Sequence, residues 1–391
     1  MTASTLDTSA RTPLKGWLAV LAVTLGIFSL VTTEILPIGL LTPIGEDFRI
    51  SPGTAGLTMT LPGFLAALAA PAVTVAAGRL DRRGLLCALM AVLALADLVA
   101  ATAQVYWAVL ASRVLVGLVI GAFWAIGSGL ATRLVGPGRA GTATAVIFSA
   151  VPLGSVLGVP AGTFVGELFG WRAAFAVMGV FTLAVLAALA LSLPPLPSAR
   201  ATRLDVLREM TRGRATRLGL LVTVLVVLAH FGTYTYVTPL LRDVTQVRPE
   251  LITVFLLVYG TAGIAGNFVA GATIARDLRL TFLTAAGLIG VATLALPFLG
   301  GSKPGALVLL VVWGFAYGAV PVCSGTWFAQ AAPHAPEAAS VLFTSSFQAT
   351  LSAGALLGGF VVDSVSVPAV MVAGGVVALL AAGVLSRART A

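Results

Sequence analysis

One carboxylate lies inside a long stretch of apolar and neutral residues near the start of the sequence. Residues 28–45 read FSLVTTEILPIGLLTPIG, and Glu34 is the one ionisable side chain among them. At the centre of a bilayer a charged carboxylate costs about 2.5–3.5 kcal/mol, so such a group faces a wet cavity, pairs with a cation or carries a proton. Glu34 is therefore a candidate for proton uptake and release or for substrate contact, with a fixed packing contact as the alternative.

Two more ionisable side chains lie within apolar sequence. Arg113 is expected at a depth similar to that of Glu34, and a pair between them would break when the glutamate is protonated, giving a two-state switch. The alternative for Arg113 is snorkelling to the outer interface. His230 can change charge near neutral pH, and its alternative is a neutral histidine hydrogen-bonded between helices. We interpret Glu34, Arg113 and His230 as the proton-coupling residues; Asp97, expected in a peripheral helix, is not included.

Aromatic and amide side chains are spread through the same apolar stretches. Rings stack on an amphipathic ligand, and hydroxyl or amide groups orient it by hydrogen bonds. Tyr234, for example, lies one helical turn from His230. The candidates for a substrate cavity are Phe123, Trp124, Phe231, Tyr234, Tyr236, Asn267, Trp327 and Gln348. Packing between helices is the alternative for each of them.

The composition indicates which kind of element must position these residues. The chain has 391 residues, of which 59% are hydrophobic and 9% charged, and its mean hydropathy is +1.05. A soluble globular chain carries about 25% charged residues, whereas apolar runs of 18 residues or more, which recur here, cross a bilayer core of about 30 Å. We therefore expect an all-α integral membrane protein embedded in the lipid bilayer.

Other partners and chemistries are disfavoured by the same composition. The formal net charge of +9 is spread over short loops, so no nucleic-acid partner is expected. The two cysteines, Cys87 and Cys323, lie in apolar segments and give neither a disulfide framework nor a metal-binding spacing. No metal, no cofactor and no enzymatic activity are expected.

Glycine, proline and charged residues divide the chain into twelve apolar segments. The expected helices are 16–42, 52–77, 85–103, 105–133, 140–166, 172–193, 217–241, 250–274, 280–300, 305–331, 338–362 and 367–386. Segment 194–216 is the longest interruption and carries five arginines. We therefore expect six helices in residues 1–193, a basic linker over 194–216 and six helices in residues 217–391.

Lysine and arginine are distributed unequally over the loops. With the N-terminus inside, 17 of them lie in inner segments and 5 in outer loops. Because positively charged short loops stay in the cytoplasm, both termini and the linker are expected to be cytoplasmic. The usage of alanine, arginine and glycine is typical of a GC-rich bacterium, so the expected location is the bacterial inner membrane.

The sequence repeats itself at an offset of about 196 residues. Matching pairs are Asp47 with Asp243, Asp81 with Asp277, Gly158 with Gly354, Gly162 with Gly358 and, at offset 197, Gly117 with Gly314. The two six-helix halves are therefore parallel repeats, and in transporters built this way the site lies near the midplane between the halves. At the same offset Glu34 corresponds to His230.

Several motifs resemble those of a known family. GRLDRRG (78–84) resembles its loop motif between the second and third helices, SRVLVGLVIGAFW (112–124) its fourth-helix motif, and GSVLGVPAGTFVGELFGWR (154–172) its fifth-helix motif, which is typical of exporters. The chain resembles the twelve-helix drug:proton antiporter family of the major facilitator superfamily over essentially its whole length. TTEILPIGLLTPI (32–44) is most similar to bacterial purine ribonucleoside efflux permeases, and AHFGTYTYVTPLL (229–241) to bacterial sugar efflux permeases.

The resemblance implies a function as well as a fold. It implies a monomeric, proton-coupled antiporter that exports a small organic molecule such as a drug, a sugar or a nucleoside by alternating access. The residues that would gate the cytoplasmic face or let helices pack closely and rock are Gly78, Asp81, Arg82, Gly117, Gly154, Gly158, Pro160 and Gly162. The alternative is an uptake symporter or a facilitator of the same fold. A sensor is disfavoured because the longest loop is too short for a signalling domain.

Overall fold

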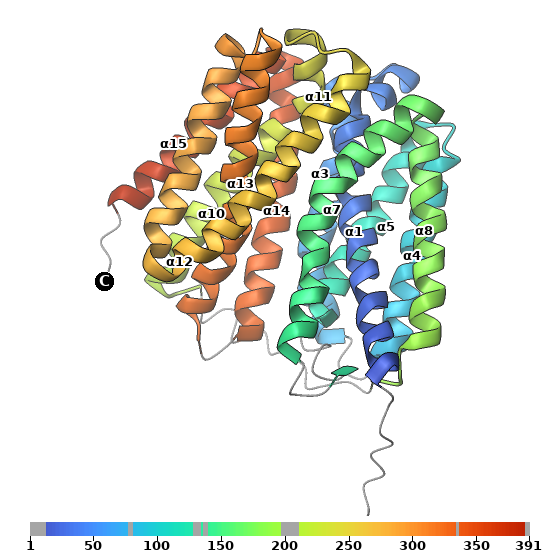
Figure 1. The fold of residues 1–391 in the computed structure, drawn as a ribbon. Coiled ribbons are helices and arrows are strands. Elements are labelled where there is room, and N and C mark those ends of the chain that lie inside the picture. Colours follow the sequence, from blue (N-terminus) through green and yellow to red (C-terminus); the bar gives the residue numbers. More distant parts are fainter. Residues whose placement is uncertain are drawn as a thin grey trace, which may run out of the picture.

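The computed structural model describes residues 13–76, 81–127, 134–135, 140–196, 211–333 and 336–387. Long helices run between the two ends of the molecule, and Figure 1 shows α1–α8 on its right side and α10–α15 on its left. We call α1–α8 the N-terminal helices and α10–α15 the C-terminal helices. The end at which α1 begins and α8 finishes is called the linker end, and the opposite end is called the distal end.

The N-terminal helices are α1 (Pro13–Phe48), α2 (Pro52–Ala55), α3 (Leu57–Ala76), α4 (Arg82–Ala101), α5 (Tyr106–Gly127), α7 (Ala140–Phe169) and α8 (Trp171–Ser192). The C-terminal helices are α10 (Arg214–Tyr234), α11 (Val237–Pro239), the π-helix η3 (Leu240–Val244), α12 (Pro249–Leu299), α13 (Lys303–Ala331), α14 (Pro336–Ser364) and α15 (Val367–Arg387). Within the described residues, eleven helices are long and apolar enough to cross a membrane.

The longest helix, α12, accounts for two crossings. Asp277 has φ −155° and ψ 99°, which is not helical, so the chain turns there and returns. Its carboxylate accepts a hydrogen bond from the backbone N–H of Leu280 at 2.9 Å, which starts the second limb in the manner of a helix N-cap. The twelve membrane-spanning helices expected from the sequence are therefore confirmed.

One expected helix is shorter than predicted. The sequence predicted a continuous helix over 217–241, but α10 ends at Tyr234 and is followed by a turn, α11 and the π-helix η3. Pro239 explains the break, because it has no N–H to donate to the carbonyl of Thr235 and its ring crowds that carbonyl. The hydroxyl of Tyr236, just after the break, donates to the carbonyl of Ala355 at 2.7 Å.

The internal repeat is visible in how the helices touch. In α5 a Cβ atom at Gly121 would collide with the backbone of α3 at Ala66, and in α13 a Cβ atom at Gly318 would collide with the backbone of α12 at Gly263. Each residue of the second contact follows its counterpart by 197 positions. Small residues let helices approach this closely in a membrane, and the repeat builds the same contact twice.

The contacts between the N-terminal and the C-terminal helices are also related by the repeat offset of 196 or 197 residues. Gly63 of α3 packs against Ser352 of α14, and Gly260 of α12 packs against Val156 of α7. Ser352 follows Val156 by 196 residues and Gly260 follows Gly63 by 197. The two sets of helices therefore meet along two equivalent seams, one between α3 and α14 and one between α7 and α12.

Candidate functional site

Glu34 lies between the N-terminal and the C-terminal helices, at the side of α1 that faces α13 and α14. Its side chain is 7% exposed, and Gln348 of α14 donates Nε2–H to Glu34 Oε1 at 2.8 Å. The hydroxyl of Tyr317 in α13 is close enough to interact electrostatically with the carboxyl. A proton that binds to Glu34 therefore changes a contact that joins the two sets of helices.

Arg113 supports the part of α1 that carries Glu34. Pro37 has no N–H, so the carbonyl of Thr33 lacks its usual partner one turn along the helix. Nη1 of Arg113, in α5, donates to this carbonyl at 2.9 Å. The guanidinium is fully buried and lies 5.0 Å from the centre of the Phe175 ring. A cation thus takes over the hydrogen bond that the proline removes.

The charge that faces Arg113 is Asp97 of α4 and not Glu34. Arg113 Nη2 lies 4.0 Å from Asp97 Oδ1, with both side chains fully buried, and the hydroxyl of Thr33 donates to Asp97 Oδ2 at 3.1 Å. The expected Glu34–Arg113 pair is therefore wrong for this structure. Thr33 and Glu34 are neighbours on α1, and successive side chains on a helix point about 100° apart, so Thr33 faces α4 and α5 while Glu34 faces the C-terminal helices.

Sequence reasoning left Asp97 out although one signal could have found it. Asp97 lies four residues before the end of α4 and Arg113 seven residues after the start of α5. The two helices are antiparallel neighbours joined by a short turn, so residues at similar distances from that turn lie at a similar depth. The buried face of α4 also includes Asp97, so the helix is peripheral but this side chain points inward.

His230 lies inside a cluster of aromatic rings, which we call the His230 cluster: Phe231, Tyr234, Tyr259, Trp313 and Tyr317. Trp313 Nε1–H donates to His230 Nδ1 at 3.1 Å, so Nδ1 carries no proton and the geometry is that of a neutral imidazole. Tyr317 stacks on the imidazole with ring centres 3.4 Å apart. The Nε2 atom is fully buried and has no hydrogen-bond partner among the described residues.

The structure brings some of the predicted cavity residues together around Glu34 and His230. Phe231 and Tyr234 belong to the His230 cluster, and Gln348 binds Glu34. Tyr317 connects the two groups, since it stacks on the imidazole and interacts with the carboxyl. Three of the chain's five tyrosines, those at 234, 259 and 317, surround His230. Tyrosine is rare in this chain, and this rarity was a sequence signal that could have identified all three as candidate site residues.

The other predicted cavity residues lie elsewhere. Phe123 is buried among the N-terminal helices near Met90, and Tyr236 lies between α10 and α11, where its hydroxyl donates to a carbonyl of α14. The indole of Trp327 donates to the carbonyl of Ala215 at 3.0 Å, at the start of α10. Asn267 is half-buried on α12, where its backbone lies beside Gly318 of α13. The side chain of Trp124 lies outside the described part of the structure.

The N-terminal and C-terminal helices are joined at the distal end, and we call these contacts the distal seal. Asp363 of α14 accepts a hydrogen bond from the backbone N–H of Gly53 at 2.9 Å, at the start of α2. Arg242 of η3 pairs with Glu46 of α1 at 2.6 Å, and Thr238 donates to a carbonyl of α1 at 3.0 Å. The distal seal therefore holds the N-terminal and the C-terminal helices together at that end of the molecule.

The twelve-helix repeat, the buried ionisable residues between the repeats and the distal seal form the geometry of a transporter. A family model agrees: that of the Major Facilitator Superfamily matches residues 21–348. The chain belongs to the major facilitator superfamily. It is therefore a multi-pass membrane protein and a secondary transporter for small molecules, and it is not an enzyme, as the sequence predicted.

Two curated relatives are similar to this chain over nearly their whole length. OpdE of Pseudomonas aeruginosa, named a transcription regulatory protein, is 32% identical over 391 residues, which is 98% of this chain and 96% of OpdE. NepI of Escherichia coli K12, named a purine ribonucleoside efflux pump, is 30% identical over 369 residues, which is 94% of this chain and 92% of NepI.

Solved structures of the superfamily show the same fold. An inward-facing, unoccupied structure of a bacterial homologue of the human lysosomal transporter Spinster matches with a TM-score of 0.75 at 17% identity, over 96% of this chain and 97% of that one. The human organic anion transporter MFSD10 matches with a TM-score of 0.67 at 21% identity, over 95% and 99%.

The superfamily's fifth-helix motif packs against the stretch of α1 that carries Glu34. Gly154, Gly158 and Gly162 of α7 contact Val31, Thr32 and Leu36 of α1 respectively. Pro160 lies on the same helix and is buried. The motif gives α1 a smooth surface next to the turn that contains Pro37. Motion along this surface stays a prediction.

The superfamily's loop motif ties the linker to α4. Asp81 caps the N-terminus of α4, and its Oδ1 accepts from the backbone N–H of Leu196 at 2.6 Å. These hydrogen bonds, the Leu196 one above all, hold the pKa of the Asp81 carboxyl below its usual range. The N–H of Arg82 donates to the carbonyl of Leu196 at 2.9 Å. Gly78 lies outside the described residues. A latch between the two sets of helices stays a prediction.

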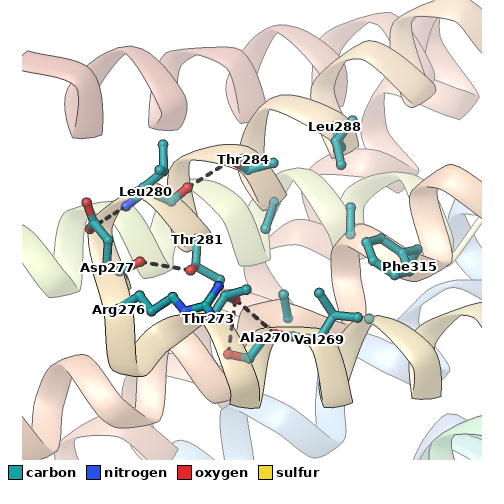
Figure 2. Close-up of a pocket in the computed structure, with 14 residues that line it drawn as sticks. Val269, Ala270, Thr273, Arg276, Asp277, Leu280, Thr281, Thr284, Leu288 and Phe315 are labelled. Atoms are coloured by element: carbon teal, nitrogen blue, oxygen red, sulfur yellow. Dashed lines mark hydrogen bonds between the residues drawn. The ribbon is translucent and has the colours of Figure 1, made fainter.

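A cavity of about 290 Å³ lies away from these groups, between the two limbs of α12 and α13 near the linker end (Figure 2). Its threonines donate to the backbone of their own helix, as Thr273 does to Val269 and Thr281 to Asp277. The only cation among its lining residues is Arg276. None of Glu34, Arg113 and His230 lines it, so it is not the site described above.

Proposed function

We propose that this protein is a proton-coupled antiporter that exports a small organic molecule from the bacterial cytoplasm by alternating access. One observation carries the proposal: Glu34, a buried carboxyl of the N-terminal helices, is held by Gln348 of the C-terminal helices. A single proton can therefore alter the contact on which the relative position of the two helix sets depends. The moving units would be residues 1–193 and 217–391, joined by 194–216.

Protonation of Glu34 changes the strength of its hydrogen bond with Gln348. A hydrogen bond to an ionised carboxylate is roughly twice as strong as one between neutral groups, so protonation weakens the hold of Gln348 on Glu34. An ionised Glu34 favours the closed contact or a substrate with hydrogen-bond donors, and a protonated Glu34 releases either. Proton and substrate then compete for one group, which is what exchange requires. The proton-coupling residues proposed here are Glu34, Arg113 and His230.

The direction of transport is argued from orientation. The excess of lysine and arginine at the linker end favours a cytoplasmic linker end, and the distal seal would then lie on the outer side, which favours an inward-facing state. The fifth-helix motif favours export, and NepI is named for efflux of purine ribonucleosides. Nucleosides, sugars and amphipathic drugs such as antibiotics are the substrate classes to test, and export of antibiotics would give resistance. The protein is proposed to act as a monomer in the inner membrane.

The test is proton flux in proteoliposomes with an imposed pH gradient and a pH-sensitive dye. Nucleosides, sugars and antibiotics are added in turn to vesicles with wild type, Glu34→Gln or the control Glu250→Gln, whose carboxyl is exposed at the start of α12. We expect one substrate class to collapse the gradient in wild type and control but not in Glu34→Gln.

Each other result has a meaning. Substrate movement without proton movement contradicts the antiporter and leaves a facilitator, and proton entry together with substrate entry gives a symporter. Collapse that survives Glu34→Gln removes Glu34 from the coupling role. If no substrate moves in any preparation, the three substrate classes tested are excluded for this transporter.

A further inference from the structure

The buried pair of Asp97 and Arg113 is left open. Asp97 Oδ1 and Arg113 Nη2 are 4.0 Å apart, beyond hydrogen-bonding distance. Each of these two atoms is fully buried, and neither has a hydrogen-bond partner among the described residues. An unpaired charged atom in the protein interior carries a large desolvation cost. Two such atoms that face each other without bonding therefore need an explanation.

The exposed ion pairs of the same structure provide a comparison. Arg172 and Asp47 close to 2.8 Å, and Arg242 and Glu46 close to 2.6 Å. Attraction between opposite charges is much stronger in a buried site than at the surface. If Asp97 and Arg113 were both charged, this attraction would draw them to a shorter distance than that of either exposed pair. The open geometry leaves Asp97 Oδ1 free to carry a proton.

The open pair is connected directly to the residue beside Glu34. Thr33 donates its hydroxyl to Asp97 Oδ2 at 3.1 Å and accepts Arg113 Nη1 on its carbonyl at 2.9 Å. Gly179 of α8 packs against Asp97, and one turn before Thr33 the hydroxyl of Ser29 forms a hydrogen bond with that of Thr182, which is also in α8. The groups around the carboxyl thus come from α1, α5 and α8, and the same arginine also binds the Thr33 carbonyl of α1.

We propose that Asp97 is a second proton-binding carboxyl of the transport cycle, coupled to Glu34 through Thr33 and Arg113. A proton from water adds to Oδ1 when the pair is open, and it leaves when Arg113 closes onto the carboxylate; no other bond is made or broken. Arg113 keeps its charge and its bond to the Thr33 carbonyl in both states. The inference rests on the proposed proton coupling and adds a site on the far side of α1 from Glu34.

The test is an infrared pH titration of the carboxyl bands of the full-length protein in lipid vesicles, without substrate. Wild type is compared with Asp97→Asn, Glu34→Gln and the matched control Asp47→Asn, which removes the carboxylate of a closed, exposed pair. We expect two protonatable carboxyls that exchange slowly in D2O. Asp97→Asn removes one of them, Glu34→Gln the other, and Asp47→Asn neither.

The outcomes separate this proposal from the proposed function. If Asp97→Asn titrates like wild type while Glu34→Gln loses a band, the second site is overturned and the antiporter stands. If only Asp97→Asn loses a band, the second site stands and the role given to Glu34 fails. If neither variant changes the titration, both fail. Should Asp97→Asn not fold, Asp97→Glu keeps a carboxyl and must move one titration step; an unmoved titration overturns the proposal.

Discussion

At the scale of single residues, two neighbours on α1 contact different sets of helices. Thr33 faces Asp97 and Arg113 within the N-terminal helices, and Glu34 faces Gln348 of the C-terminal helices. Pro37 frees the carbonyl that Arg113 binds. Successive side chains on a helix point about 100° apart, so one turn of α1 holds a charge network on one side and an inter-helix contact on the other.

The Gln348 amide should matter for coupling. Gln348→Leu removes the hydrogen-bond donor to Glu34 and puts an apolar side chain in place of the amide. A hydrogen bond to a charged group contributes about 1.5–3 kcal/mol, and about 1.4 kcal/mol corresponds to tenfold. We expect proton-coupled transport in proteoliposomes to fall by roughly 10- to 100-fold. Gln330→Leu, exposed near the end of α13, is the control, and an equal loss there would contradict the argument.

Asp81 gives a prediction that depends on pH. Its pKa is lowered chiefly by the N–H of Leu196, so the ionised form is the one that holds the linker. The contact is fully present above the ordinary aspartate pKa of about 4 and is lost as the pH falls through the lower value in the folded protein. Asp81→Asn should therefore speed hydrogen exchange at the Leu196 amide at neutral pH. The difference from wild type should shrink in acid; a constant difference would exclude the carboxylate as the cause.

At the scale of elements, the sequence could predict where most helices lie but not where they bend or break. Apolar runs and charged loops place the spans, because a bilayer fixes their length. The end of α10 at Tyr234 and the turn at Asp277 depend on how Pro239 and a capping carboxylate are used. Asp81 and Asp277 occupy equivalent positions in the repeat, and both cap the next helix. The offset of 196 residues between Asp81 and Asp277 was the sequence signal for this shared role.

Close helix contact at glycine predicts opposite effects for two substitutions. Gly318→Ala places a Cβ against the backbone of α12 at Gly263, and overpacking costs about 1–3 kcal/mol. Gly271→Ala meets no atom within 4 Å, and alanine is favoured over glycine in a helix by about 0.5–1 kcal/mol. Thermal unfolding of the solubilised protein should show a lower midpoint for the first variant and an equal or higher one for the second. Equal losses in both would contradict this packing account.

At the scale of the whole molecule, the repeat was the most informative feature of the sequence. The offset of about 196 related Glu34 to His230, and the structure shows the same offset in both seams between the helix sets. It did not anticipate that the two positions differ in character, since Glu34 is hydrogen-bonded across the interface while His230 is enclosed by rings. Nor did it reveal Asp97 facing Arg113. Which faces of two helices meet depends on packing, and no residue pattern within a single helix states it.

The distal seal contains two contacts of unequal strength, and their difference can be measured. Arg242 and Glu46 are 41% and 60% exposed, so their pair contributes at most about 1 kcal/mol. Asp363 accepts hydrogen bonds from Ser51 and Gly53 at the N-terminus of α2, where a negative charge is favoured by the helix dipole. Its removal should therefore open the distal end more than removal of Arg242.

Spin labels on two exposed distal residues, Gln104 of the N-terminal helices and Ser364 of the C-terminal helices, report the opening as a longer distance. We expect Arg242→Ala to change the open fraction by fivefold or less, and Asp363→Ala to change it more. Exchanging the charges with Glu46→Arg and Arg242→Glu together should restore the wild-type distribution. If Arg242→Ala opens the distal end as far as Asp363→Ala does, charge attraction rather than the capped helix closes the distal end, and rising salt should then increase the open fraction of the wild type.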